Sequence, residues 1–245
     1  MEPVFVDVHS HMLPSGDDGV GSVAEGRRLC REAHRRGTRL LFATPHVWPH
    51  LTLTDDREAA IRRAYAQLRA EAGLEVRLGF ELTPDPPLLR EDPWRYELEG
   101  TGAVLMEVPF LGGTGLLFAL AEHVERHGLR PVIAHPERTE SVLHDPGLAR
   151  ELAARGWLLQ VNASSLTGRH GPDIKELAWR LVEDGLASLV ASDGHRQTRP
   201  PFLDEAFAAV RRRIGERARA LFDGSAVGLA LEISSENGYG RSARL

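Results

Sequence analysis

The feature that most constrains the fold is a regular alternation of short apolar runs with helical segments. The apolar runs are predicted to be strands at residues 4–8, 40–44, 75–80, 103–106, 131–134, 157–161 and 188–191. Helical patterns fall between and after them, at residues 22–36, 54–73, 116–128, 146–156, 173–185, 203–214 and 216–222. Strands that alternate with helices form right-handed βαβ units and a parallel sheet. The sequence therefore predicts an α/β fold, either a distorted (β/α)7 barrel or a doubly wound open sheet.

Polar side chains decide between these two architectures, because they recur at the carboxyl ends of the predicted strands. The positions are His9 and His11, His46, Glu81, Glu107, His135, and Asp193 with His195. Barrel active sites are built at that face from the ends of several strands. An open sheet would spread these ends along a line, whereas a barrel brings them into one ring. We therefore expect a TIM-barrel-like (β/α)7 fold with a single polar site.

The first strand ends in His9-Ser10-His11. Side chains on a strand repeat every two residues, so both imidazoles point the same way and offer half of a metal site. Asp17 and Asp18 follow on a Gly-flanked loop that could fold back and add carboxylate oxygen. Taken alone, this stretch is better explained as an N-terminal strand followed by a polar turn. The ligands at the other strand ends favour the metal site.

Histidines and carboxylates without a thiolate suit Mn, Fe or Zn in mixed nitrogen and oxygen coordination. The candidate ligands exceed the requirement of one ion, and Glu81 at the centre of the ring could bridge two, so we expect two or three metals. Paired ions ~3.5–4 Å apart suit phosphoester hydrolysis by a metal-activated water. Arg138 lies just past a candidate ligand, and its planar fork matches a phosphate. Arg199 is a second candidate, although either arginine could be a solvated surface charge.

Other chemistries are less consistent with the sequence. The segment from Cys30 to Arg36 has the C-x5-R spacing of cysteine-dependent phosphatases, but it contains no glycine and lies late in an amphipathic helix. No G-x-S-x-G elbow is present. An amidohydrolase-type C–N hydrolase also begins with H-x-H, yet Lys175, the only lysine, falls in a helix instead of on a middle strand. A non-catalytic metal-binding or scaffold protein is the remaining class.

Composition bounds the rest. At 245 residues and 42% hydrophobic, the chain suits one barrel domain, predicted at residues 1–233 with a polar tail at 234–245. A net charge of −5 argues against a nucleic-acid partner. One cysteine fits a reducing compartment. No apolar run approaches the ~18 residues that span a bilayer, so we expect a cytoplasmic protein without membrane insertion. The sequence does not decide whether the chain forms a homo-oligomer.

The motifs resemble those of the polymerase-and-histidinol-phosphatase (PHP) superfamily, and most closely its bacterial capsule-type metal-dependent protein tyrosine phosphatases. The matching segments are DVHSH with LPSGDDG, ATPH, GFEL, LMEVP, IAHPER, QVNASSL, and ASDGH followed by RPP. They occur in the family's order as far as about Pro201. Two departures are the glycine at position 194, where bulkier residues are common, and the segment after Phe222, which lacks the usual Asn-Pro.

The resemblance implies a distorted (β/α)7 barrel with a trinuclear, usually manganese-dependent site. The ligands of one ion would be His9, His11, Glu81 and Asp193. A second ion would share Glu81 and take Glu107 and His135. A third would take Asp18, His46 and His195, whereas Asp17 would hold the shape of its loop. Arg138 would bind the phosphate and stabilise the transition state, with Arg199 assisting.

The resemblance also implies a substrate and a partner. The expected substrate is a phosphotyrosine on the tail of a bacterial tyrosine kinase that controls exopolysaccharide export. Within phosphoester chemistry the alternative is a small-molecule phosphatase, such as one that acts on histidinol phosphate.

Overall fold

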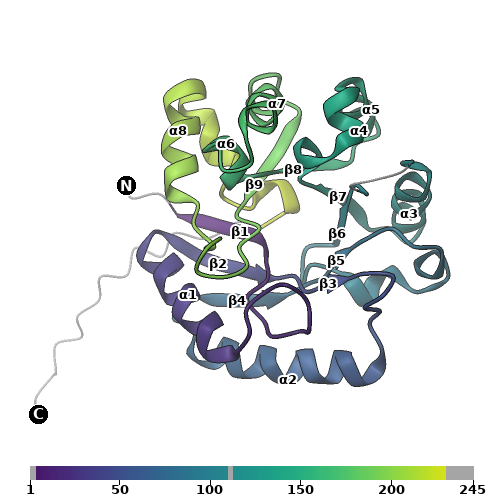
Figure 1. The fold of residues 1–245 in the computed structure, drawn as a ribbon, viewed down its shortest axis with the longest axis vertical. Helices are drawn as coiled ribbons and strands as arrows, with labels where there is room; N and C mark the ends of the chain where they lie inside the picture. The colour runs from purple at the N-terminus through teal and green to yellow at the C-terminus, as the bar shows by residue number, and fades with distance from the viewer. Residues whose placement is uncertain (1–3, 110–112, 230–245) are drawn as a thin grey trace, which may run out of the picture.

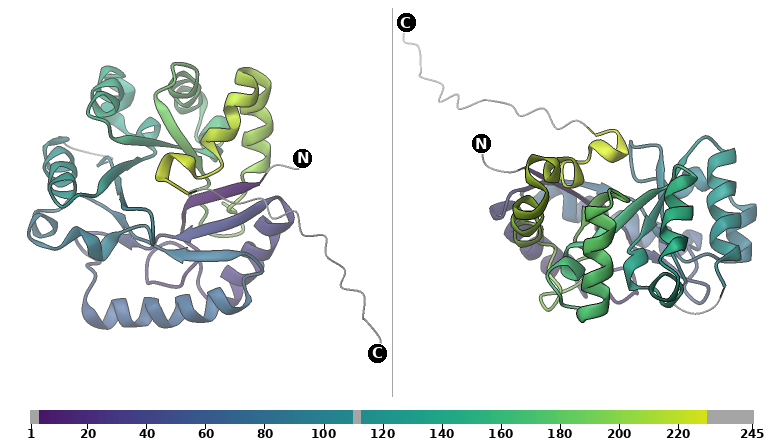
Figure 2. Two further views of the ribbon diagram at one scale, coloured as in Figure 1. Left: turned by 180° about the vertical axis from the view of Figure 1, so that it is seen from behind. Right: turned by 90° about the horizontal axis from the view of Figure 1, so that it is seen from above.

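The strands form a ring of parallel strands, and the helices lie outside it (Figures 1 and 2). The computed structural model describes residues 4–109 and 113–229. Its strands are β1 Phe5–Ser10, β2 Thr38–Ala43, β3 His46–Val47, β4 Glu75–Leu78, β5 Glu81–Leu82, β6 Ala103–Glu107, β7 Arg130–Ala134, β8 Leu158–Asn162 and β9 Ala187–Ala191. They pair in the orders β1-β2-β4 and β3-β5-β6-β7-β8-β9, and the pairs are parallel.

Two of the predicted strands, at residues 40–44 and 75–80, are each followed after a short break by a two-residue strand that was not predicted. The break between β2 and β3 falls at Thr44 and Pro45, where proline supplies no N–H. The break between β4 and β5 falls at Gly79, which packs so closely on Leu98 that a Cβ would lie 2.5 Å from its Cδ2. The Glu81 N–H still donates to the Pro45 carbonyl at 3.1 Å, so the two broken strands stay paired. With each divided strand taken as one position, the described residues form a ring of seven.

The ring closes between β1 and β9. Ser10 and Gly194 form a parallel bridge, and the Asp193 N–H donates to the His9 carbonyl at 2.9 Å. Below this bridge the Asp7 carboxylate accepts a hydrogen bond from the Ser192 N–H at 3.0 Å. These contacts exclude the open sheet and confirm the predicted distorted (β/α)7 barrel.

The longer helices of the described residues begin and end within two residues of the predicted bounds. Helix α1, Val23–Arg35, is capped by Ser22, whose hydroxyl accepts from the Glu25 N–H at 3.2 Å. Helix α2, Asp55–Glu71, is capped by Thr54 in the same way. The remaining helices are α3 Gly115–Arg126, α4 Glu140–His144, α5 Gly147–Ala154, α6 Ala163–Leu166, α7 Pro172–Glu183 and α8 Asp204–Ile214.

Several short helical elements differ from the prediction. Helices α4 and α6 were not predicted, because four or five residues are too few for an amphipathic period. The segment between β5 and β6 contains the 3-10 helices η1 Pro86–Arg90 and η2 Pro93–Tyr96, each with proline in its first turn. The helix predicted at 216–222 is a 3-10 helix, η4 Gly215–Leu221. The domain boundary predicted at residue 233 and the tail at 234–245 lie outside the described residues.

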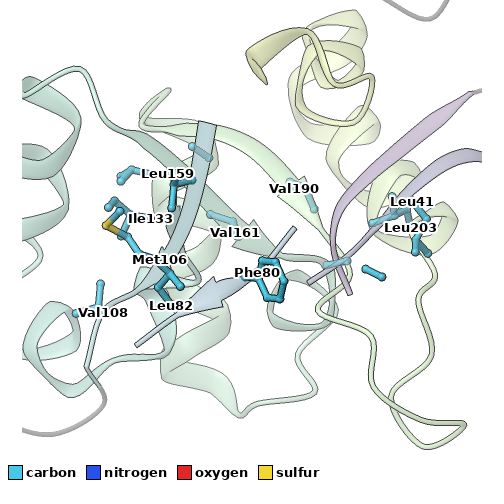
Figure 3. Close-up of a cluster of buried hydrophobic side chains, with 14 of the residues drawn as sticks. Leu41, Phe80, Leu82, Met106, Val108, Ile133, Leu159, Val161, Val190 and Leu203 are labelled. Atoms are coloured by element: carbon cyan, nitrogen blue, oxygen red, sulfur yellow. The ribbon is translucent and has the colours of Figure 1, made fainter. Parts of the chain in front are cut away.

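Hydrophobic side chains pack on both faces of the strands. The larger cluster combines one face of the strands with the helices, and Figure 3 shows part of it, including Met106 and Ile133. The smaller cluster takes alternate residues from β1, β2, β6, β7 and β9, among them Val8, Phe42 and Leu105. Side chains from strands around the whole ring can meet only inside it, so this cluster fills the barrel interior.

Candidate metal centre

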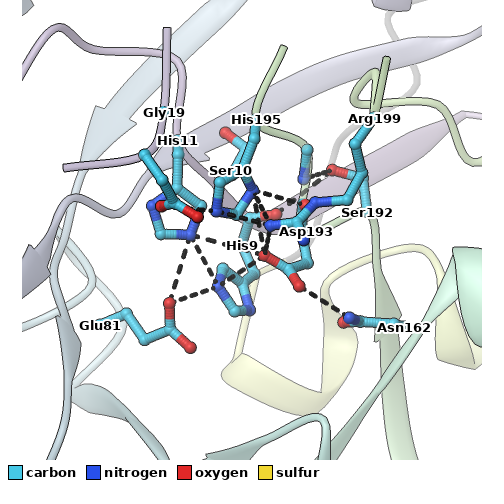
Figure 4. Close-up of polar contacts among 12 residues, drawn as sticks. His9, Ser10, His11, Gly19, Glu81, Asn162, Ser192, Asp193, His195 and Arg199 are labelled. Carbon is cyan, nitrogen blue, oxygen red and sulfur yellow. Dashed lines mark hydrogen bonds and ion pairs between the residues drawn. The ribbon is translucent and has the colours of Figure 1, made fainter. Parts of the chain in front are cut away.

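Glu81 lies at the centre of a group of histidines that come from different strand ends. Its Oε2 atom is 3.0 Å from His9 Nε2, 3.2 Å from His11 Nε2 and 3.0 Å from His46 Nδ1. Its Oε1 atom is 2.9 Å from His135 Nε2. Figure 4 shows the Glu81 carboxylate in contact with His9 on β1 and with His11 just after it. The central position expected for Glu81 is therefore the observed one.

Three groups of side chains offer ligand atoms within 4.8 Å of one another. They are His9 with His11 and Asp193, His9 with Glu81 and His135, and His11 with His46 and His195. Asp18 adds a carboxylate to the last group, because its Oδ1 lies 3.1 Å from His195 Nε2. Glu107 lines a cavity next to these groups and accepts a hydrogen bond from Thr83, but it belongs to none of the three groups. The ion-by-ion assignment implied by the resemblance stays a prediction.

The charges of the site fit bound cations. Burial alone would raise the pKa of Glu81, but His9, His46 and His11 hold it well below its usual range. Burial and the neighbouring charge of Glu81 raise the pKa of Glu107 to about 7. The buried Oε2 atom of Glu81 accepts no hydrogen bond from the described residues. Carboxylate oxygens and imidazole nitrogens that converge in a buried space are suited to holding metal ions.

Two site residues have backbone conformations that side-chain-bearing residues rarely adopt. His135 has φ 32° and Asp193 has φ 49°, both in the left-handed region. Such strain persists where the surrounding structure enforces it, often at functional sites. Gly194 follows directly, and a Cβ there would lie 2.6 Å from the Cα of Pro201. Glycine at this position, noted in the sequence as a departure, is therefore required by the close packing of Pro201.

Both candidate arginines lie beside the metal-binding side chains. Arg138 Nη1 donates to Asp193 Oδ2 at 2.7 Å, and Arg199 Nη2 lies 3.3 Å from Asp193 Oδ1. Arg199 also contacts His195. A cavity of about 210 Å³ opens here, lined by Asp18, His46, Trp48, Glu107, His135, Arg138, Asp193, His195 and Arg199. One cavity thus combines anionic ligands with two permanent positive charges.

A chain of amides behind the site was not predicted. Gln160 Oε1 accepts a hydrogen bond from His9 Nδ1 at 2.9 Å, and Gln160 Nε2 donates to Asn162 Oδ1 at 2.8 Å. Asn162 Nδ2 in turn donates to Asp193 Oδ2 at 2.8 Å (Figure 4). With its Nδ1–H occupied, His9 presents the Nε2 lone pair to the site. The signal was the QVNASSL motif, in which Gln160 and Asn162 share one face of a strand.

The loop that carries Asp18 is held as the sequence predicts, with help from residues it did not single out. Asp17 Oδ1 accepts from the Gly19 N–H at 3.0 Å, and Oδ2 accepts from the His46 N–H at 3.0 Å. This is the structural role expected for Asp17. Arg196 Nε also donates to the Gly19 carbonyl at 2.8 Å. The loop is therefore tied to two other strand ends.

The alternative nucleophile is excluded by its position. Cys30 is buried on α1, and burial raises the pKa of its thiol to about 12. Lys175 lies on α7 against Gly168 and does not line the cavity.

Within the described part of the chain, no helix is long and apolar enough to cross a membrane.

Fold and site together define a class of protein: a barrel protein with a candidate polynuclear metal site of histidines and carboxylates at the carboxyl ends of the strands. The chain belongs to the CpsB/CapC family of capsular polysaccharide synthesis, whose family model matches residues 5–225.

Its relatives carry the name of one activity. The chain is 32% identical over 223 residues to the tyrosine-protein phosphatase YwqE of Bacillus subtilis, covering 86% of this chain and 85% of the relative. It is 29% identical over 232 residues to the tyrosine-protein phosphatase CpsB of Streptococcus agalactiae, covering 89% and 95%.

Solved structures agree on the fold. One comes from work on YwqE of B. subtilis and CpsB of Streptococcus pneumoniae, described as unique metal-dependent tyrosine phosphatases. It superposes with a TM-score of 0.80 at 30% identity, covering 90% of this chain and 92% of that one. A lactonase from Listeria monocytogenes superposes with a TM-score of 0.55 at 14% identity, covering 89% and 94%. The second likeness shows the barrel alone.

Proposed function

We propose that this chain is a metal-dependent tyrosine-protein phosphatase that acts in capsular polysaccharide synthesis. The observation that carries the proposal is the convergence of four histidine nitrogens on the two oxygens of Glu81, beside a cavity that two arginines also line. The family and the names of the relatives support the same activity.

We propose two or three divalent ions, manganese first, with iron or zinc as alternatives. Bound ions of this kind supply a nucleophile by lowering the pKa of water, and they neutralise phosphoryl oxygens. The side chains proposed to hold them are His9, His11, Asp18, His46, Glu81, Glu107, His135, Asp193 and His195. Gln160 and Asn162 orient two of these ligands through the hydrogen bonds described above.

The arginines are proposed to bind the phosphate. Arg138 and Arg199 are held on opposite oxygens of the buried Asp193 carboxylate, so their guanidinium groups lie at fixed positions at the cavity. A phosphate in this cavity would be contacted by planar cations, whose charge stabilises the additional negative charge of the transition state. Arg138 is assigned the larger role, since its side chain is the more deeply buried, 17% against 24% exposed.

The proposed substrate is a phosphotyrosine on another protein, and the proposed partner is the tail of a bacterial tyrosine kinase in exopolysaccharide regulation. The cavity volume of about 210 Å³ suits a phosphorylated side chain better than a whole protein surface, so the tail would enter as an extended segment.

The test compares substrates on manganese-loaded protein. We expect hydrolysis of a phosphotyrosine peptide to exceed that of histidinol phosphate and of an amide substrate. Arg138→Ala should lower the peptide rate by about 10²- to 10³-fold while the metal content, measured on the same samples, stays unchanged. No turnover of the peptide would refute the proposal, and faster turnover of histidinol phosphate would assign a small-molecule phosphatase. An unchanged rate in Arg138→Ala would remove this residue from the mechanism.

A further inference from the structure

The cavity at the metal centre has one wall that the chemistry described so far does not use. Eight of its nine lining residues carry an ionisable side chain, and the exception is Trp48. Trp48 is partly exposed, in contrast to His46 two residues earlier, which is buried. An indole at the opening of such a polar cavity exposes apolar area where the substrate must enter.

Trp48 is held in place from several sides. Its ring stacks on the His46 imidazole with the centroids 4.3 Å apart and 26° between the planes. The turn that follows is closed by the Leu51 N–H, which donates to the Trp48 carbonyl at 2.9 Å. Trp48 also lines a small second cavity together with Leu53 and Leu88, so apolar side chains lie behind it. The indole is therefore a preorganised surface.

The surface of this indole already accepts flat rings. Besides His46, the exposed His50 stacks on it with centroids 5.2 Å apart and 23° between the planes. His46 is buried among the strands and cannot leave, whereas His50 lies on an exposed turn from which a competing ring can displace it. An aromatic ring brought to this position would gain a stacked contact.

A phosphotyrosine substrate would bring its own ring into the same cavity. With its phosphate between the metal ligands and the arginines, the organic group must lie against what remains of the cavity lining. Each of the other eight lining side chains is proposed to bind metal or phosphate, which leaves Trp48 to contact the ring.

We propose that Trp48 binds the aromatic ring of the substrate and gives the site its preference for aryl over alkyl phosphates. This inference rests on the proposed function, and it names a specificity residue that the metal ligands and arginines do not supply.

The experiment measures binding of two non-hydrolysable probes, phenylphosphonate and methylphosphonate, to manganese-loaded protein by calorimetry. In the unmodified protein phenylphosphonate should bind more tightly. Trp48→Ala and Trp48→Leu should weaken phenylphosphonate by about tenfold, as expected for loss of an aromatic pair and its buried area, and leave methylphosphonate unchanged. Trp48→Phe should retain most of the preference, because it retains a ring.

Trp94→Ala is the matched control, since Trp94 is 50% exposed and lies outside the cavity. It should leave both affinities unchanged. Equal weakening of the two phosphonates in Trp48→Leu would overturn the inference, because it would show that Trp48 only supports His46. Unchanged affinities for both phosphonates in Trp48→Leu would overturn it as well. Turnover of the phosphotyrosine peptide tests the proposed function separately, so the failure of one is distinguishable from the failure of the other.

Discussion

The barrel interior and the carboxyl end of the barrel are built by the same strands from opposite kinds of side chain. On β6, Leu105 packs in the interior cluster, and Glu107, two residues later on the same face, lines the cavity beside the candidate metal ligands. Ala191, the last residue of β9, belongs to the same interior cluster, and Asp193, two residues past it, belongs to the candidate metal site. Apolar burial stabilises the fold by itself, whereas buried charge is costly until it is compensated. On these two strands, the residues that stabilise the fold and the residues of the candidate site are therefore only two positions apart.

Replacing Glu81 should give the largest effect and the sharpest test of this separation. Glu81→Ala removes the carboxylate that four histidines face, so we expect lost metal and a fall in peptide turnover on the order of 10³-fold. Metal analysis and the rate on a phosphotyrosine peptide check it. Glu75→Ala, an exposed carboxylate on β4, is the control that should change neither quantity.

A substitution in the barrel interior should have the opposite effect, with lower stability and unchanged metal content. Leu105 is fully buried, so Leu105→Ala should lower the free energy of unfolding by about 2–5 kcal/mol, through lost burial and the cavity that remains. Urea unfolding measures the loss, and the metal content of the folded fraction should stay the same. Loss of metal before unfolding would mean that interior and site are not separable.

A smaller effect is expected from the amide chain behind the site. Gln160→Leu removes the acceptor for His9 Nδ1 and the donor to Asn162, so we expect metal affinity to fall by about 10- to 100-fold. Titration of metal into the metal-free variant measures it. Gln67→Leu, on the exposed surface of α2, should bind metal as the unmodified protein does.

The smallest effect concerns Cys30, which lies on the helix side of the barrel. Because burial raises the pKa of its thiol to about 12, the native protein should react slowly with iodoacetamide at pH 8 and rapidly after unfolding. Cys30→Ala should keep full activity on the phosphotyrosine peptide. A large loss in this variant would reopen the cysteine mechanism that the position of the residue excludes.

Much of the architecture could be predicted because the strands are short, apolar and regularly spaced. The candidate ligands followed from one rule, that polar residues at strand ends meet in a closed ring. Trp48 and Gln160 could not be assigned roles in this way, because an aromatic residue in a loop and an amide inside a strand have many ordinary explanations. The short strands β3 and β5 were also missed, since two residues are too few to show a strand pattern and the break at Gly79 depends on its close packing against Leu98.

The junction between β1 and β9 has a consequence for how the molecule assembles. Asp7 and Ser192 are 185 residues apart in the chain, yet their hydrogen bond closes the ring directly beneath the metal ligands. Contacts between such distant segments form late, because the loop-closure entropy must be overcome first. The ligands from β1 and β9 therefore meet only when the ring is complete, and metal uptake should report the final step of folding.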